Sequence, residues 1–554
     1  MRQRFAFFSL SATVVLYLSL LAWGTNRSYQ HLHIVLLLLQ YGIMLWGAVW
    51  CLRQSAGPGI ALLPPLPGFG AVVVCFALLA MPLSWFTTRG LLNPDESGYS
   101  FQARIYRSGR IMADPLIGAT ADVRETPAEL FYANHILRPS GWFPKFPPGW
   151  PIVLSTGYLV SANWLPNPIL GSLQLCVILF IGSRCFSRET GIIASILAVL
   201  SPFYLVNSIG RMSHALCAVL AAAACLALFR GLSTGKLGYF AAMFACLAAT
   251  FQVRPYTGFV LTTVTTLAAL WFSRANRKLL VRVFLVGVFF GCLALTGVLS
   301  YNHICTGKWL VSPYAQAAGV NTPPELSINP IAVWRGMARY APYMLTESLF
   351  GTFPFLYLLA GYAVVRENRS RREVYFLAAL FTSLVLAYLA HPDGYGVLLG
   401  ERFHFEAFFA VVLLAARGLQ LLLEHWKTSR AAFISAVLVL GILQLGQLTA
   451  AAHAVSKIGE PYRRVREAVE QPEISGLVFL HDNDGFVAKL FNLNAADWRH
   501  ASRIYLIDAQ PELRAEWACR YGFSRWSVVS YDARTRQATL INDTANCEPH
   551  LKLR

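Results

Sequence analysis

Charged side chains are scarce in this sequence. Asp, Glu, Lys and Arg together make up 13% of the 554 residues, whereas a soluble globular protein has about 25%. Hydrophobic residues make up 56% of the chain. This composition excludes an ordinary soluble enzyme and predicts a polytopic α-helical membrane protein.

The sequence also lacks internal repeats, low-complexity segments and any Cys-x-x-Cys pair. Without such a pair a thiolate zinc site is not expected. Most of the 11 cysteines lie singly in hydrophobic runs, where a thiol behaves as a small hydrophobe. Cys519 and Cys547 differ, because both lie in the polar C-terminal tail. They could form a disulfide bond if that tail lies in an oxidising compartment.

Long hydrophobic runs fill most of the chain as far as residue 452. Counted against a hydrocarbon thickness of about 30 Å, they predict about thirteen transmembrane helices. The first run follows a basic start but is longer than the core of a signal peptide, and no Ala-x-Ala site follows it, so we expect a retained helix. The predicted spans are Phe5–Trp23, His31–Leu52, Phe69–Thr88, Asn167–Ser183, Gly191–Ile209, Ser213–Phe229, Leu237–Gln252, Tyr256–Phe272, Leu279–Tyr301, Tyr343–Val365, Val374–Ala390, Phe403–Leu423 and Ala431–Ala452.

The Lys and Arg residues, which give a net charge of +18, lie mostly in alternate short loops between these runs. That distribution sets membrane topology, and nucleic acid is not an expected partner. With the N-terminus in the cytoplasm, the basic loops are cytoplasmic and two long loops, 89–150 and 302–342, lie outside. The spans and these loops form one transmembrane domain, residues 1–452. Residues 453–554 form a small outer α/β domain, with strands expected at Leu477–His481, Ile504–Asp508, Trp526–Tyr531 and Gln537–Ile541 and a helix at Glu512–Tyr521.

Two adjacent acids, Asp95 and Glu96, begin the first outer loop after the third predicted span. The structural interpretation is a helix start, with Asn93 as N-cap, Pro94 at the first position and Glu96 closing a capping box. The functional interpretation uses the same geometry, because an ionised carboxylate held at a membrane surface can accept a proton or bind a divalent cation. Both can hold if Glu96 caps the helix while Asp95 acts.

Lys145 lies in a segment rich in Pro and aromatic residues, Trp142–Pro151. The prolines there are expected to prevent a helix and to hold the backbone extended. The structural interpretation is an interfacial anchor, since Trp and Lys are common at that depth. The functional interpretation is a cation that binds a phosphate group.

Four further polar residues lie at predicted outer turns: Arg211, His214, Arg254 and Arg402. Each alone is typical of a residue that reaches from a helix end to the interface. Together with Lys145 they indicate a polyanionic ligand such as a lipid-linked phosphate. Arg402 and Glu406 are spaced to pair along one helix. His404 and Glu406 are two residues apart and do not share a helix face, so a metal site is not expected there.

The order of these motifs resembles the GT-C superfamily of integral-membrane glycosyltransferases, in particular bacterial protein-mannosyltransferase-like and aminoarabinose-transferase-like enzymes. The resemblance covers about Phe69 to Leu423. It rests on Pro94-Asp95-Glu96-x-x-Tyr99, Lys145-Phe146-Pro147-Pro148-Gly149-Trp150-Pro151, Ser213-His214, Arg254-Pro255 and Gly400-Glu401-Arg402-Phe403.

The resemblance implies transfer of a sugar from a polyprenyl-phosphate donor to a lipid, glycan or protein of the cell envelope. Asp95, with Glu96, would be the catalytic base or the carboxylate that orients a divalent metal ion. Lys145, Arg211, His214, Arg254, Arg402 and Tyr99 would bind the donor phosphate or substrate. Some relatives carry a second acid where this chain has Ser213-His214, which leaves a bound metal open. The chain also has two spans before the one that leads to the acidic pair, where the usual core begins with one.

The implied location is a bacterial inner membrane with the outer tail in the periplasm. Two other hypotheses stay open. A transporter or flippase for a lipid-linked saccharide would place its charges in mid-membrane and show repeat symmetry, whereas here the charges lie at the edges of the spans. A structural assembly subunit would use Asp95 and Glu96 only to cap a helix.

Overall fold

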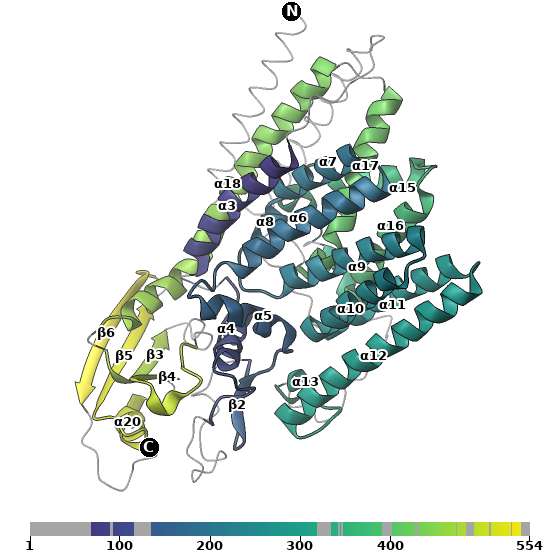
Figure 1. Ribbon diagram of the computed structural model, residues 1–554. Coiled ribbons are helices and arrows are strands. Elements are labelled where there is room, and N and C mark those ends of the chain that lie inside the picture. Colours follow the sequence, from purple (N-terminus) through teal and green to yellow (C-terminus); the bar gives the residue numbers. More distant parts are fainter. Residues whose placement is uncertain are drawn as a thin grey trace, which may run out of the picture.

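A computed structural model of the chain describes residues 68–88, 92–115, 134–317, 334–338, 340–341, 344, 347–389, 402–426, 430–472, 474–482, 492–508, 511–532 and 534–544. The described part consists of a helical bundle, a small mixed layer at one end of the bundle, and a C-terminal sheet beyond that layer (Figure 1). This agrees with the expected membrane fold that ends in a small α/β unit.

The bundle contains seven described helical segments that are long and apolar enough to cross a membrane. Two shorter apolar helices, α10 (Leu237–Val253) and α15 (Leu356–Arg366), pack among them. Because the first two predicted spans lie outside the described residues, the total of thirteen stays a prediction. The long helices are α3 (Phe69–Thr88), α6 (Pro166–Cys185), α9 (His214–Thr234), α11 (Pro255–Ser273), α12 (Arg277–Thr306), α16 (Arg371–Leu389) and α17 (Phe408–Trp426), the last continuing a 3₁₀ turn, η5 (Arg402–Ala407).

Proline sets several helix boundaries in the bundle. The predicted span Gly191–Ile209 is two helices, α7 (Arg188–Val199) and α8 (Pro202–Asn207), because Pro202 begins a new helix after the turn at Ser201. Pro255 likewise begins α11 directly after α10, and Arg254 is the residue between them. The expected turn at Arg254-Pro255 is therefore present.

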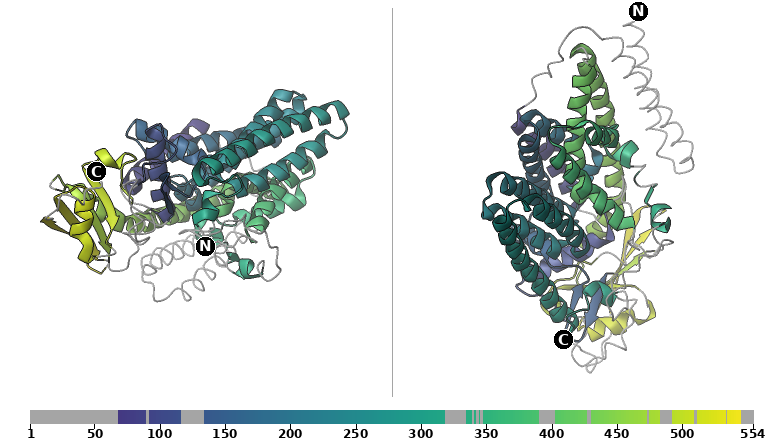
Figure 2. Two further views of the ribbon diagram at one scale, coloured as in Figure 1. Left: turned by 90° about the horizontal axis from the view of Figure 1, so that it is seen from below. Right: turned by 90° about the vertical axis from the view of Figure 1, so that its right-hand side faces the viewer.

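The last helix of the bundle, α18 (Arg430–Val469), is 40 residues long. It packs against α3 and then continues beyond the bundle to the C-terminal sheet (Figures 1 and 2). The expected domain boundary at residue 452 therefore falls inside a continuous helix. A helix of this length spans about 60 Å, which is enough to connect membrane and tail rigidly.

The tail forms the expected strands and helix. Its four-stranded sheet has the order β4-β3-β5-β6, with β3 parallel to β4 and β5, and β6 antiparallel to β5. Cys519 is disulfide-bonded, while its candidate partner Cys547 lies outside the described residues. The elements are β3 (Gly476–Asp482), β4 (Arg503–Ile507), α20 (Arg514–Arg520), β5 (Arg525–Asp532) and β6 (Gln537–Thr544).

The layer between bundle and tail contains α4 (Pro94–Arg107), the hairpin β1 (His135–Arg138) and β2 (Gly141–Pro144), and α5 (Gly149–Leu159) (Figure 1). A short helix, α13 (Pro313–Ala317), follows α12 and contacts the hairpin. One face of α4, including Phe101 and Ile105, shares a hydrophobic core with Trp142 and the tail sheet. The N-terminus of α4 is thus fixed between tail and bundle.

The sequence prediction missed α5. The expected extended backbone of Trp142–Pro151 holds only as far as Pro148, because a helix begins at Gly149 and tolerates Pro151 in its first turn. Gly149 lies against the main chain of α10, where an added Cβ would be 2.8 Å from the Gln252 carbonyl carbon. A glycine is therefore required for α5 to pack on α10.

Candidate active site

Asn93 and Pro94 start α4 as predicted. Asn93 has an extended backbone, and its side chain accepts a 2.9 Å hydrogen bond from the Asp95 N–H. Pro94, at the first helical position, has no N–H that needs a partner. The helix N-terminus favours negative charge, so Asp95 and Glu96 lie where carboxylates are stabilised.

Asp95 is the more exposed of these two acids. Its side chain is 23% exposed, and Oδ2 is 3.1 Å from Nη2 of Arg402. The other oxygen accepts a 3.2 Å hydrogen bond from the Asn134 side chain. Asp95 is therefore held by a cation and an amide while part of its carboxylate faces outward.

Glu96, which was expected to be catalytic together with Asp95, lies in a different environment from Asp95. It is 2% exposed. Its two carboxylate oxygens accept the main-chain N–H groups of Leu92 at 3.1 Å and Arg211 at 2.9 Å. Burial raises the pKa of the Glu96 carboxyl, while Arg211 opposes that rise. Glu96 thus joins the start of α4 to the turn before α9; it reaches Leu92 rather than Asn93, one residue beyond a standard capping box.

Lys145 follows β2 and is linked to Asp95 through Asn134. Its main-chain N–H donates to the Asn134 carbonyl oxygen at 3.0 Å, and Asn134 also binds Asp95. The Lys145 Nζ is 5.3 Å from the centre of the Tyr314 ring and 5.8 Å from that of Phe146. These aromatic faces hold the ammonium group by cation–π attraction. Tyr314, in α13, is a site residue that sequence reasoning missed.

Arg254 and His214 belong to a buried network beneath this open region. Glu406 has no exposed side-chain surface; its Oε1 is 3.0 Å from Arg254 Nε and 2.8 Å from His214 Nδ1. Arg402 and Glu406 do not pair with each other, because residues 402–407 form a 3₁₀ turn that turns Arg402 to Asp95. His214 is also fully buried, so in this structure it supports Glu406 and Arg254 instead of lining an accessible surface.

Ser213 and Tyr99 connect the buried network to α4. The Tyr99 hydroxyl lies 3.2 Å from Ser213 Oγ, and Arg254 donates to the same oxygen at 3.2 Å. The Tyr99 ring stacks on Phe146, with 4.2 Å between ring centres. Tyr99 is 3% exposed, which makes it a support for Lys145 and Arg254 more than a surface for substrate.

Arg211, which was expected at the donor phosphate, has its side chain on another face of α4 from Asp95. Its side chain donates to Ser100 Oγ at 3.1 Å on another face of α4. Its main chain binds Glu96 and accepts a 2.7 Å hydrogen bond from the Trp150 indole. Arg211 is 6% exposed and fixes α4 and α5 to the α8–α9 turn.

A second buried network lies near the first and was not predicted. His404 Nε2 is 2.8 Å from Glu347, and its Nδ1 is 2.7 Å from the Tyr340 hydroxyl. His404 and Glu406 therefore point into separate networks, as their spacing indicated. Long-range pairs of this kind leave no local pattern in the sequence.

Whether the acids near Asp95 could bind a metal ion depends on the partners that they already have. Glu96 is occupied by main-chain N–H groups and Glu406 by Arg254 and His214. Among the residues that the structure describes, no group of three or more His, Cys, Asp or Glu side chains could hold a metal ion. These donors do not fit a metal held at Asp95 by several protein ligands.

Comparison with known families supports the architecture. Residues 156–301, from within α5 to within α12, match the family model of dolichyl-phosphate-mannose-protein mannosyltransferase. No match to a curated protein was found.

Two solved structures are similar to this chain. ArnT from Cupriavidus metallidurans has 12% identity and a TM-score of 0.52, with 87% of this chain and 99% of that chain covered. The oligosaccharyltransferase AglB from Archaeoglobus fulgidus has 12% identity and a TM-score of 0.49, with 83% and 69% covered. The family match over residues 156–301 and the fold shared with ArnT agree with the resemblance to the GT-C superfamily of integral-membrane glycosyltransferases.

Proposed function

We propose that this protein is a glycosyltransferase that moves a sugar from a polyprenyl-phosphate donor to an acceptor hydroxyl of the cell envelope. The observation that carries the proposal is the setting of Asp95: a partly exposed carboxylate at a helix N-terminus, 3.1 Å from Arg402 and adjoining the segment that holds Lys145. A base and a phosphate-binding cation at one site are the groups that such a transfer needs.

In the proposed reaction Asp95 accepts the proton of the acceptor hydroxyl. The acceptor oxygen forms a bond to the anomeric carbon as the bond from that carbon to the phosphate oxygen breaks. The bonding electrons leave with the polyprenyl phosphate, so configuration is inverted in a single displacement. Arg402 and Asn134 hold the Asp95 carboxylate in position.

Lys145 stabilises the negative charge that develops on the leaving phosphate. Its ammonium group is held at the rings of Phe146 and Tyr314, with no carboxylate paired to it among the described residues. A cation held in position before reaction is more effective than one that must be reorganised. The buried network of Glu406, Arg254 and His214 lies beneath Asp95 and Lys145 and supports them.

The donor class has support from the fold neighbour, because the ArnT structure contains bound undecaprenyl phosphate. We further propose the orientation indicated by the charge pattern, with Asp95 and the tail on the periplasmic side of a bacterial inner membrane. The acceptor is then a lipid, glycan or protein hydroxyl on that side.

A detergent assay separates this proposal from the flippase alternative. Purified protein is incubated in micelles with a polyprenyl-phosphate sugar, and the released polyprenyl phosphate is measured. Transfer needs no membrane barrier, so release that depends on added acceptor supports the enzyme. No release with a panel of donors, together with lipid movement across reconstituted vesicles, would replace the proposal with a transporter.

A further inference from the structure

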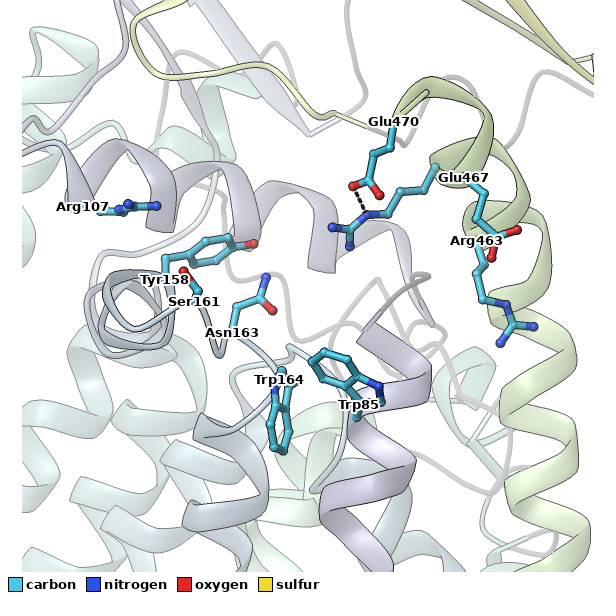
Figure 3. Close-up of a pocket in the computed structure, with 10 residues that line it drawn as sticks. Trp85, Arg107, Tyr158, Ser161, Asn163, Trp164, Arg463, Glu467 and Glu470 are labelled. Atoms are coloured by element: carbon cyan, nitrogen blue, oxygen red, sulfur yellow. Dashed lines mark hydrogen bonds and ion pairs between the residues drawn. The ribbon is translucent and has the colours of Figure 1, made fainter. Parts of the chain in front are cut away.

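A second cavity, of about 520 Å³, lies at the far end of α4 from Asp95. Asp95 and Arg107 are twelve residues apart on this helix, so the cavity lies about 18 Å along α4 from the candidate active site. Four segments that are distant in sequence form its walls (Figure 3). Its lining residues are Trp85, Arg107, Tyr158, Ser161, Asn163, Trp164, Arg463, Arg466, Glu467 and Glu470.

Two of the arginines that line this cavity are available to a ligand. Arg466 is paired with Glu470 at 2.6 Å. Among the described residues, the side chains of Arg107 and Arg463 have no hydrogen-bond or ion-pair partner. They come from different walls, one on α4 and one on α18. In Figure 3 Arg107 and Arg463 lie on opposite sides of the cavity, with Tyr158 and Asn163 between them. Guanidinium groups on both sides of one cavity favour an anionic group with several oxygens, such as a phosphate headgroup.

Each of the two glutamates that line the cavity is paired with an arginine, Glu470 with Arg466 and Glu467 with Arg464. Further cations act on Tyr158. Burial opposes ionisation of the Tyr158 phenol, but Arg211 and Arg104 outweigh burial and lower its pKa to about 8. In Figure 3 the Tyr158 side chain extends from α5 between α4 and α18. A phenol of this kind donates a strong hydrogen bond to an anionic oxygen.

The floor of the cavity is aromatic and lies at the end of two membrane helices. Trp85, near the end of α3, meets Trp164, just before α6, edge to face with 5.5 Å between ring centres. Trp at this depth is typical of the membrane interface. Below it α3 exposes apolar side chains, among them Leu78 at 69% and Phe86 at 58%. A polar cavity therefore continues directly into a lipid-facing surface.

We propose that this cavity binds the phosphate headgroup of an anionic membrane lipid, with Arg107 and Arg463 on the two sides of the headgroup and the acyl chains along the exposed face of α3. The lipid would lie where α18 leaves the bundle and would fix the tail to α4. This site is separate from the chemistry at Asp95 and does not rest on the proposed function.

The test measures lipid retained by the full-length protein. Protein in mild detergent is mixed with phosphatidylglycerol or phosphatidylcholine, and bound lipid is counted by native mass spectrometry. Wild-type protein is expected to retain phosphatidylglycerol in preference to phosphatidylcholine. The double variant Arg107→Gln/Arg463→Gln should weaken retention about 30-fold, which is about 2 kcal/mol.

Arg464→Gln is the matched control, because Arg464 is the next residue on α18, is paired with Glu460 and Glu467, and does not line the cavity. It should retain lipid as wild type does. Lys variants at 107 and 463 keep the charge and should fall between wild type and the Gln variant, which guards against misfolding as the cause of loss. Equal retention by wild type and the double variant overturns the proposal. Displacement of bound lipid by millimolar inorganic phosphate also overturns it, since the site would then recognise phosphate without a lipid.

Discussion

Two neighbouring regions of this protein use acids and arginines in opposite ways. At the open region, Asp95 meets Arg402 with part of its carboxylate exposed. In the buried region, Glu406 meets Arg254 and His214 with no exposed surface. An exposed ion pair contributes about 0–1 kcal/mol to stability, whereas breaking a buried one costs about 3–5 kcal/mol; the partly exposed Asp95–Arg402 pair lies between these limits. We therefore propose that the Asp95–Arg402 pair serves the chemistry and that the Glu406–Arg254 pair serves the structure.

The largest expected effect concerns the open region. Asp95→Asn removes the base and should lower sugar transfer about 1,000-fold, with a smaller fall in the unfolding temperature than Glu406→Gln, because the lost ion pair is partly exposed. Asp114→Asn is the matched control: Asp114 pairs with Arg110 at 3.1 Å and is 32% exposed. Full transfer by the Asp95 variant would remove the proposed base.

For the buried ion pair we expect a loss of stability, in contrast to the loss of transfer expected for Asp95. Glu406→Gln leaves Arg254 without its buried counter-charge and should reduce stability by about 3 kcal/mol, measured as a lower unfolding temperature in detergent. Glu424→Gln, in the same helix but 66% exposed, should leave stability unchanged. A Glu406 variant as stable as wild type would contradict a structural role for this network.

Lys145 is the residue that we expect to act on the leaving phosphate. Lys145→Gln should lower transfer about 100-fold by removing charge stabilisation at the phosphate, and stability should hardly change. Lys308→Gln, at another exposed position beyond α12, serves as control. The account of Lys145 fails if transfer falls no more in its variant than in the Lys308 variant.

The smallest expected effect is the ionisation of Tyr158 as the pH is raised. Tyr158 should ionise near pH 8, below the usual tyrosine pKa of about 10. Because the folded pKa is the lower one, this group's stabilising contribution is complete only above pH 10 and is lost as pH falls through about 8. Ultraviolet absorbance of phenolate should show this step in wild type and in Tyr106→Phe, but not in Tyr158→Phe. A wild-type protein without a step below about pH 9 would contradict it.

Local patterns in the sequence predicted much of the fold. The predicted span Phe69–Thr88 coincides with α3, the Asn93-Pro94 start of α4 is correct, and the tail strands lie where alternation placed them. These features depend on hydrophobic length, capping and periodicity, which neighbouring residues determine.

The partners of the site residues could not be predicted in the same way. Glu406 contacts Arg254 and His214, which are more than 150 residues away in the chain, and Glu96 binds the Arg211 main chain. Helix α5 was missed because its prolines indicated extended backbone, while packing of Gly149 on α10 allows a helix to begin there. Such outcomes depend on tertiary packing and not on local propensity.

If Asp95 carries the chemistry and Glu96 the structure, variants of these adjacent acids should separate sugar transfer from stability. Initial rates of sugar transfer are compared for Asp95→Asn and Glu96→Gln, each normalised to folded protein. Glu96→Gln should lose about 1–3 kcal/mol of stability through its buried N–H partners yet keep transfer within about tenfold of wild type. Asp95→Asn should remain stable and lose transfer about 1,000-fold. Equal losses of transfer in the two variants, or a greater loss in Glu96→Gln, would contradict the account.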